Sequence, residues 1–487
     1  MVKTNEKGLS AGGLVMLALG TVIGGSFFLG SAIAINAAGP GVIVAFLLGG
    51  ALVYIILFSL SEMTVAYPAA GSFRTFSEHM YGFMAGFVVG WVYWTGLVLA
   101  MSSEAIAVSV FIRTYLPSFS LPVLGAAVII AVTLINLLGV DKLSKLESSL
   151  AGVKIFAIIG FIVLAVLLVA GLISGRVPVG IGEILSEPFF PNGIAGIAGS
   201  MLIVMFTYAG FEIVGLAASE AYNAKETVPR AITFTVLSLV GLYVVAVGLL
   251  LFLVPTAVLN EKVSPLVSAL NRHGLSLAST VINAVLITAI FSTMMAAVFG
   301  IARMLRSLAD EGHAPKWLKD RGDIPYRGIL FSGLAMLFGL AMGFILPQRI
   351  YLFLVSSGGF AFLFVYLTIV ATHLKFRKIY GCPPKGKCQL PLYPYTNIVA
   401  IIFLLVIMAS MPFIKGQGSG LIAGLSLVFL YVLIYFVKKH VEDKKGIEEV
   451  IRHELSYFRL QTAMEAAKEF PLPNGCKSCM ENQQDDS

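Results

Sequence analysis

The stretch that decides the fold is Gly20-Thr21-Val22-Ile23-Gly24-Gly25-Ser26-Phe27-Phe28-Leu29-Gly30, which lies in the middle of an apolar segment long enough to cross a bilayer. Its Gly24-Gly25 pair disfavours a continuous helix, because glycine loses the most backbone entropy when a helix fixes it. Within lipid, non-helical backbone is tolerated only where it lines a cavity or is buried in protein. The stretch therefore predicts a helix that breaks at mid-membrane, with backbone N–H and C=O groups facing a ligand.

A second stretch of this kind is Phe206-Thr207-Tyr208-Ala209-Gly210-Phe211-Glu212, which also lies inside an apolar segment and carries a carboxylate. Paired interruptions at corresponding positions of two halves are the best sequence pointer to a transporter's binding site. The alternative is that these glycines only let helices pack closely, as small residues do in membrane bundles. The pairing of the stretches and the presence of Glu212 favour a binding site.

The composition indicates an all-α integral membrane protein, since 58% of the residues are hydrophobic and 12% are charged, against about a quarter charged in soluble domains. Twelve segments are long and apolar enough to span a bilayer. We expect one polytopic domain over 1–440 and a cytoplasmic tail over 441–487. The twelve predicted spans are 10–35, 41–66, 81–112, 121–140, 148–174, 194–220, 231–254, 275–305, 328–346, 350–374, 394–414 and 418–437.

The basic residues predict the orientation of these spans. With the N-terminus in the cytoplasm, the short inner segments carry 18 of the 33 Lys and Arg residues, and the outer side carries 6. Cytoplasmic loops are enriched in Lys and Arg, so both termini are expected in the cytoplasm. This distribution also explains the net charge of +7 without a nucleic-acid partner.

The two interrupted helices are the first members of two groups of five spans, at 10–174 and 194–374, followed by extra helices at 394–437. Because five is an odd number, the second group enters the membrane from the opposite side. This is the arrangement of an inverted five-helix repeat.

The interrupted backbone offers groups for both ends of a zwitterion. Amides of Gly24–Phe28 suit an anion, because the N–H groups at a helix start attract negative charge. Carbonyls near Ile23 and around Phe206, Thr207 and Ala209 suit an ammonium group. The hypothesis is a site for the α-carboxylate and α-ammonium of an amino acid.

Ionisable side chains at membrane depth are functional candidates by default, and here they are Glu104, Lys154 and Glu212. Each has a structural alternative. Lys154 could extend to the inner interface, Glu212 could hold a hydrogen bond within the bundle, and Glu104 could be a protonated, hydrogen-bonded carboxyl. Glu62 is expected at the inner interface.

The remaining motifs predict neither catalysis nor metal binding. No nucleophile or metal constellation indicates an enzyme or a cofactor. The four cysteines lie in segments that we place in the cytoplasm, where free thiols are expected, including the Cys476 and Cys479 pair. Trp91-Val92-Tyr93-Trp94 is typical of an aromatic anchor at the membrane interface.

Many spaced motifs make the chain resemble the amino acid–polyamine–organocation superfamily, and within it the amino acid transporter family of bacterial permeases. Besides the two interrupted stretches, the motifs are Ala38-Gly39-Pro40, Ser61-Glu62-Met63, Gly71-Ser72-Phe73, Gly90-Trp91-Val92-Tyr93-Trp94, Pro229-Arg230-Ala231, Gly312-His313-Ala314-Pro315 and Pro391-Leu392-Tyr393-Pro394-Tyr395.

The resemblance implies a leucine-transporter-like fold. It also implies a substrate carboxylate on the amides at Gly24–Phe27 and an ammonium on carbonyls of the first and sixth spans. Phe206 matches the family's aromatic gate, and Glu212 matches an acidic position tied to gating and proton sensitivity. Lys154 resembles the amine that takes the place of a sodium ion in proton-coupled relatives.

One departure from the family pattern concerns the size of the substrate. The family usually has Gly-Thr-Gly or Gly-Ser-Gly where this chain has Gly24-Gly25-Ser26. Ser26 therefore places a side chain where the backbone should approach the ligand, and it could narrow the site or supply a hydroxyl.

The sequence predicts an amino acid:proton symporter of the plasma membrane, with Lys154, Glu212 and Glu104 as the candidates for proton coupling. Two alternatives stay open. One is an exchanger of amino acids or polyamines without proton drive, and the other is a sensor that binds an amino acid without transporting it.

Overall fold

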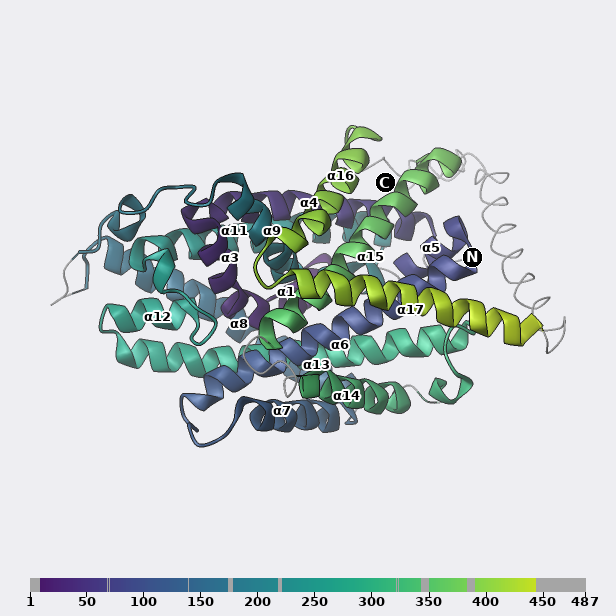
Figure 1. Cartoon of the computed structure of the whole chain (residues 1–487), viewed down its shortest axis with the longest axis horizontal. Helices are drawn as coiled ribbons and strands as arrows, with labels where there is room; N and C mark the ends of the chain where they lie inside the picture. Colours follow the sequence, from purple (N-terminus) through teal and green to yellow (C-terminus); the bar gives the residue numbers. More distant parts are fainter. Residues whose placement is uncertain are drawn as a thin grey trace, which may run out of the picture.

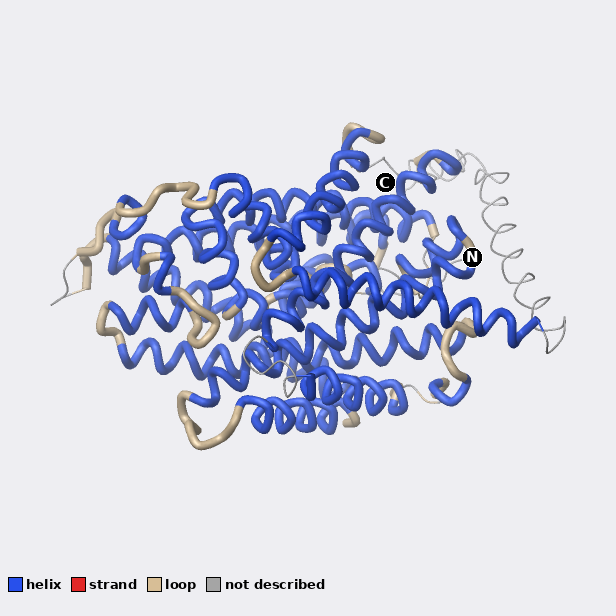
Figure 2. Tube along the Cα trace, viewed as in Figure 1, coloured by secondary structure: helices blue, strands red, loops and turns tan. Residues whose placement is uncertain are grey.

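The computed structural model of the chain describes residues 9–67, 69, 71–138, 140–173, 178–217, 221–320, 322, 324–342, 350–382 and 390–443. Over these ranges the chain is built of helices packed side by side (Figure 1). Figure 2 shows helix and loop over these ranges, and an isolated β-bridge joins Leu9 to Ala221. The predicted all-helical class is confirmed. The tail from residue 444, with Cys476 and Cys479, lies outside the described residues.

The helices follow one another along the chain without an intervening domain in the described ranges. They are α1 (Ala11–Val22), α2 (Gly25–Phe28), α3 (Gly30–Ala38), α4 (Val42–Ala66), α5 (Phe73–Tyr81), α6 (Phe83–Arg113), α7 (Leu121–Asn136), α8 (Val140–Val169), α9 (Gly193–Tyr208), α10 (Ile213–Ala217), α11 (Ala224–Leu253), α12 (Pro265–Arg272), α13 (Ser276–Asp310), α14 (Tyr326–Ala341), α15 (Ile350–Tyr380), α16 (Tyr395–Ser410) and α17 (Gly418–Asp443).

Among the described residues, nine helical stretches are long and apolar enough to cross a membrane. Three further apolar helices are shorter, namely α1, α7 and α14. One long stretch, Gly30–Ala66, joins α3 to α4 through a 3₁₀ turn at Gly39–Gly41. The sequence placed a boundary between two spans at this turn, where Pro40 follows Gly39.

The first apolar segment is interrupted at Ile23 and Gly24. Ser10 caps the start of α1, its hydroxyl accepting a hydrogen bond from the Gly13 amide at 3.2 Å. The helix ends at Val22, and both following residues are extended, Gly24 with φ −146° and ψ −163°. α2 then begins at Gly25, so helical hydrogen bonding is broken between α1 and α2.

The second interruption lies between α9 and α10. α9 ends at Tyr208, and Gly210 has φ +105°, in a region that L side chains rarely adopt. A Cβ on Gly210 would lie 3.0 Å from the carbonyl oxygen of Thr21. Glycine is therefore required here both by the backbone conformation and by the close approach of α1.

The two interrupted segments lie at the centre of the bundle. α3 packs against α9, α1 packs against α8, α10 and α13, and α6 packs against both α13 and α15. Figure 1 shows α6 and α13 running beside each other across the molecule, with α7 and α14 outside them. Side chains of α1, α6, α9 and α13 therefore converge on one region.

Two expectations from the sequence are wrong. Tyr93 and Trp94 are buried rather than interfacial, and the Trp94 indole donates to the Ser332 hydroxyl at 3.2 Å. Glu62 lies near the end of α4 and is buried among protein atoms, where it accepts from the Leu390 amide at 2.7 Å and contacts the Nε2 atom of His373 at 2.9 Å; its depth in a bilayer stays a prediction. Cys382 is disulfide-bonded rather than a free thiol; the other cysteines lie outside the described residues.

Candidate functional site

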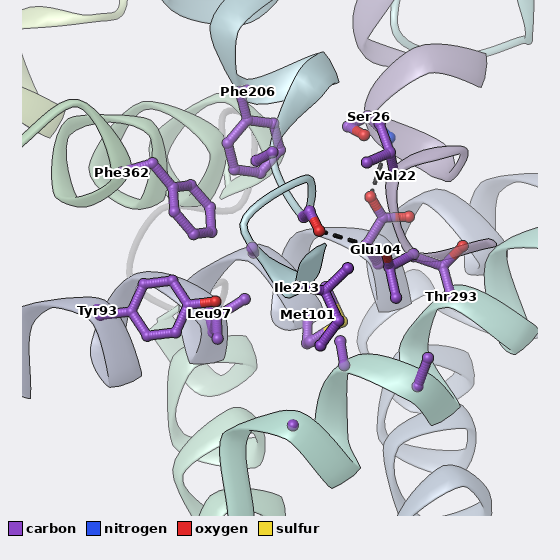
Figure 3. A pocket seen from close by; sticks show the side chains of 17 residues that line it. Val22, Ser26, Tyr93, Leu97, Met101, Glu104, Phe206, Ile213, Thr293 and Phe362 are labelled. Carbon is purple, nitrogen blue, oxygen red and sulfur yellow. Dashed lines mark hydrogen bonds between the residues drawn. The ribbon is translucent and has the colours of Figure 1, made fainter. Parts of the chain in front are cut away.

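A cavity lies where both interruptions meet α6, α13 and α15 (Figure 3). Its volume of about 60 Å³ is several times what one buried water needs. Apolar side chains make most of its wall, and polar groups gather near the α1–α2 break. The lining residues are Thr21, Val22, Ser26, Tyr93, Leu97, Ala100, Met101, Glu104, Phe206, Ala209, Gly210, Ile213, Thr293, Ala296, Ala297, Gly300 and Phe362.

Glu104 of α6 is bound to the backbone at the start of α2. Its Oε2 accepts from the Gly25 amide at 2.6 Å, and its Oε1 accepts from the Ser26 amide at 2.9 Å. Both are amides that the sequence assigned to a substrate carboxylate. The side chain is buried, so these hydrogen bonds supply solvation that water cannot. The structure thus shows that this part of the backbone accommodates a carboxylate.

Lys154 of α8 lies on the other side of the α1 break. Its ammonium nitrogen donates to the Gly20 carbonyl oxygen at 2.5 Å and to the Thr293 hydroxyl at 2.8 Å. The same hydroxyl lies 2.8 Å from the carbonyl oxygen of Ile23, to which it can donate. Lys154 is fully buried and does not extend to a surface, which excludes the interfacial alternative in this conformation. It connects α8 to the last turn of α1 and, through Thr293, to α13.

Glu212 follows the second interruption and is fully buried. The hydroxyl of Tyr93 donates to one of its oxygens at 3.0 Å, and the hydroxyl of Tyr366 donates to the other at 3.3 Å. The Gly210 amide donates to the second oxygen at 3.1 Å. Glu212 therefore joins the α9–α10 break to α6 and α15 through hydrogen bonds. This is the structural alternative that the sequence analysis named for Glu212 beside a role in gating.

Two threonines each donate a hydrogen bond from one interrupted segment to the backbone of the other. The Thr21 hydroxyl donates to the Gly210 carbonyl oxygen, and the Thr207 hydroxyl donates to the Ser26 carbonyl oxygen, each at 3.3 Å. Thr21 and Thr207 each stand three residues before a glycine of the break that follows them. The two halves thus contact each other through corresponding parts of the chain.

The sequence candidates divide into residues that line the cavity and residues behind its wall. Ser26, Phe206, Ala209, Gly210 and Glu104 belong to the lining. Figure 3 shows Phe206 and Phe362 near each other, with ring centroids 5.9 Å apart. Ile23, Gly24, Gly25 and Thr207 are buried in the adjoining backbone segments, while Lys154 and Glu212 act through the contacts above.

Phe27, whose backbone amide the sequence assigns to the substrate carboxylate, does not line the cavity with its side chain. Its ring stacks on Tyr243 with centroids 4.0 Å apart, and the residue is fully buried. Only its backbone remains a candidate contact.

The sequence analysis missed the wall supplied by α13, which includes Thr293, Ala297 and Gly300. Small and hydroxyl residues in an apolar helix carry no signal of their own. The sequence predicts Tyr93 to be part of a membrane anchor, whereas its side chain lines the cavity.

A separate cluster lies where α5 meets the end of α13. Arg74 is fully buried and pairs with Glu78 at 2.9 Å and with Glu311, while the Nε2 atom of His313 lies 2.8 Å from Glu78. The ligand atoms of Glu78, Glu311 and His313 lie within 4.8 Å of one another, a spacing that could hold a metal ion. The Arg74 guanidinium already supplies positive charge to both carboxylates, which favours an ion-pair network here.

Comparisons with known proteins place the chain among membrane permeases. Residues 13–451 match the family model described as amino acid permease. The chain is 30% identical over 459 residues to the gamma-aminobutyric acid permease of Bacillus subtilis, covering 92% of this chain and 97% of the relative. It is also 30% identical over 444 residues to the probable threonine/serine transporter YbxG of that organism, covering 89% and 95%.

A solved structure shares the fold. The manganese transporter of Eremococcus coleocola matches with a TM-score of 0.53 at 14% identity, covering 88% of this chain and 94% of that one. The relatives are permeases and transporters rather than enzymes, as the sequence predicted. With its family match and its relatives spanning most of its length, the chain belongs to the amino acid permease family.

Proposed function

We propose that this chain imports amino acids together with protons across the plasma membrane. In this proposal it has twelve spans with both termini in the cytoplasm, and its first ten spans form an inverted repeat. Alternating access arises as one group of helices rocks around the fixed cavity. Family membership supports amino acid transport, and the basic residues of the predicted inner loops support the orientation.

The observation that carries the proton-coupled reading is the position of Lys154. Its amine contacts the Gly20 carbonyl and the Thr293 hydroxyl, which lie on two different helices beside the break. A protonated amine donates to both oxygens, whereas loss of the proton removes a donor and the positive charge. The proton would therefore strengthen the contact of α8 with α1 and α13, and its release would weaken it.

A Lys154→Ala variant tests this role. We expect its accumulation ratio under an inward pH gradient to fall to about one, because no proton would couple to substrate movement. Exchange with preloaded substrate should persist, since the cavity lining is unchanged. Lys262→Ala removes an exposed lysine and is the matched control. Undiminished accumulation by Lys154→Ala would rule out the proposed role.

The substrate carboxylate would use the amides of Gly25 and Ser26, which Glu104 holds in this structure. Two carboxylates cannot occupy the same amides, so substrate binding would require Glu104 to withdraw. A neutral carboxyl accepts hydrogen bonds less strongly than a carboxylate. Protonation of Glu104 would therefore favour substrate binding.

A Glu104→Gln variant tests this exchange. The wild-type affinity for the substrate should rise when the pH is lowered from about 7.5 to about 5.5. The rise is at most about tenfold per unit of pH, over the range in which the Glu104 carboxyl takes up its proton. Glu104→Gln should bind with an affinity that depends on pH less steeply than that of the wild type, any remainder coming from Lys154. Equilibrium binding of labelled substrate measures both, with Glu226→Gln, on an exposed residue, as control. A pH dependence as steep in Glu104→Gln as in the wild type would contradict the exchange.

A further inference from the structure

Gly300 lies on the face of α13 that lines the cavity. Thr293, Ala297 and Gly300 belong to the lining together, and their spacing of four and three residues places them on one side of a helix. Thr293 marks the end of this row beside the α1 break, where its hydroxyl contacts Ile23. Gly300 marks the opposite end.

Close packing does not explain the glycine at position 300. A Cβ built there meets no heavy atom within 4 Å, whereas a Cβ on Gly328 of α14 would lie 2.9 Å from the Ala302 carbonyl oxygen. Glycine is less favourable than alanine inside a helix, so helix formation does not favour glycine at this position either. At Gly300 the space next to the backbone belongs to the cavity.

The distance along α13 matches the length of a large amino acid. A Cβ on Gly24 would lie 3.2 Å from Glu104 and 3.2 Å from Thr293, so Thr293 adjoins the carboxylate end of the cavity. Seven residues of helix separate Thr293 from Gly300, a rise of about 10 Å. Long side chains reach this far from the α-carboxylate, and short ones do not.

The wall that a side chain would meet is apolar. Leu97 and Met101 of α6 and Ile213 of α10 line the cavity; in Figure 3 Met101 and Ile213 lie together, and Leu97 lies beside Tyr93. Among the described lining residues, Glu104 is the one with a carboxylate or cationic group, and its oxygens bind the α2 amides. A charged side-chain end among these walls would lose its hydration without a counter-charge.

We propose that the cavity selects amino acids with uncharged, apolar side chains, and that Gly300 determines the longest side chain admitted. This inference rests on the proposed transport of amino acids. A larger residue at position 300 projects into the cavity without displacing protein atoms. It therefore shortens the space for the substrate and leaves the carboxylate end intact.

The test compares Gly300→Ala and Gly300→Leu with the wild type in liposomes, using alanine, leucine, phenylalanine, aspartate and lysine as substrates. Gly241→Leu is the matched control, because Gly241 is a helical glycine of α11 with nothing within 4 Å of an added Cβ and faces outward. The readout is the ratio of phenylalanine to alanine uptake, together with the KM for each. Size-exclusion profiles verify that each variant is folded.

We expect Gly300→Leu to lower the ratio of phenylalanine to alanine uptake by at least about tenfold through KM, since one missing or extra methylene in a pocket changes discrimination by that order. Gly300→Ala should lower it less, and Gly241→Leu should leave it unchanged. An unchanged ratio in Gly300→Leu, or an equal slowing of all substrates, overturns the size role. Wild-type preference for aspartate or lysine overturns the apolar selection while leaving amino acid transport intact, whereas uptake of no amino acid refutes the proposed function itself.

Discussion

At the scale of single residues, Gly210 shows most directly how the site depends on backbone. Its φ of +105° is one that glycine adopts readily and other residues rarely do. Its amide donates to Glu212, and its carbonyl oxygen accepts from Thr21. One residue therefore joins both interruptions to the buried carboxylate.

Gly210→Ala should destabilise the protein by about 1–2 kcal/mol, the cost of a left-handed conformation for an L-residue. It should also reduce transport, because the new Cβ would press on the Thr21 carbonyl 3.0 Å away. Thermal unfolding and uptake by the same preparation measure the two effects. Gly241→Ala places its methyl in open space; it should keep wild-type uptake and should not lower stability, because alanine favours a helix more than glycine does. A Gly210→Ala protein with wild-type stability and uptake would show that the break does not need this conformation.

Residue identities could be predicted from the sequence only where the chemistry is unusual for a membrane. Glu104, Lys154 and Glu212 stand out because charges at membrane depth are rare. Their partners could not be predicted, since Glu104 is 79 positions from Gly25 and Lys154 is 134 positions from Gly20. Ala297 and Gly300 carry no such signal, and only the packing of α13 against α6 reveals them.

At the scale of elements, α5 and the end of α13 are held together by the Arg74 cluster. His313 stacks on Phe83, with ring centroids 4.1 Å apart, and contacts Glu78. Burial lowers the pKa of His313 below its usual value of 6.5, although Glu78 acts in the opposite direction. The folded protein therefore keeps this ring neutral more readily than the unfolded chain does.

This shift predicts a direction for stability against pH. Above pH 6.5 the ring is neutral in both states, and the contribution of the neutral ring to stability is fully present. As the pH falls through 6.5 the unfolded chain takes up the proton first, so that contribution is lost. The melting temperature should therefore fall more in the wild type than in His313→Gln between about pH 7.5 and about pH 5.5. His440→Gln, on an exposed residue of α17, is the control; identical slopes in all three proteins would refute the prediction.

Helices could be predicted from the sequence where a long apolar stretch alone determines that they form. The predicted spans at α6, α13 and α15 form helices long and apolar enough to cross a membrane. The short helix α5 and the β-bridge between Leu9 and Ala221 were not predicted, because polar segments of this length have no distinctive period. The glycines explain why α1 and α9 end where they do, whereas their depth in a bilayer stays a prediction.

At the scale of the whole molecule, the amino acid permease family and the all-helical architecture were predictable from the sequence and are confirmed. Hydrophobic composition decides the class, and motifs in a fixed order decide the family. Twelve spans, the inverted repeat and the position of both termini stay predictions. The driving force for transport depends on how the buried charged groups respond to protons and to substrate. The amino-acid composition does not reveal this response.

The measurement that tests the central claim is uptake by the purified protein in liposomes, from a pool of all amino acids, with an inside pH of about 7.5 and an outside pH of about 5.5, with and without a protonophore. Proton symport predicts accumulation of at least one amino acid above its external concentration, and collapse of this accumulation when the protonophore is added. One-for-one exchange with a preloaded pool, without accumulation, would contradict symport and favour the exchanger. Binding without either activity would favour the sensor.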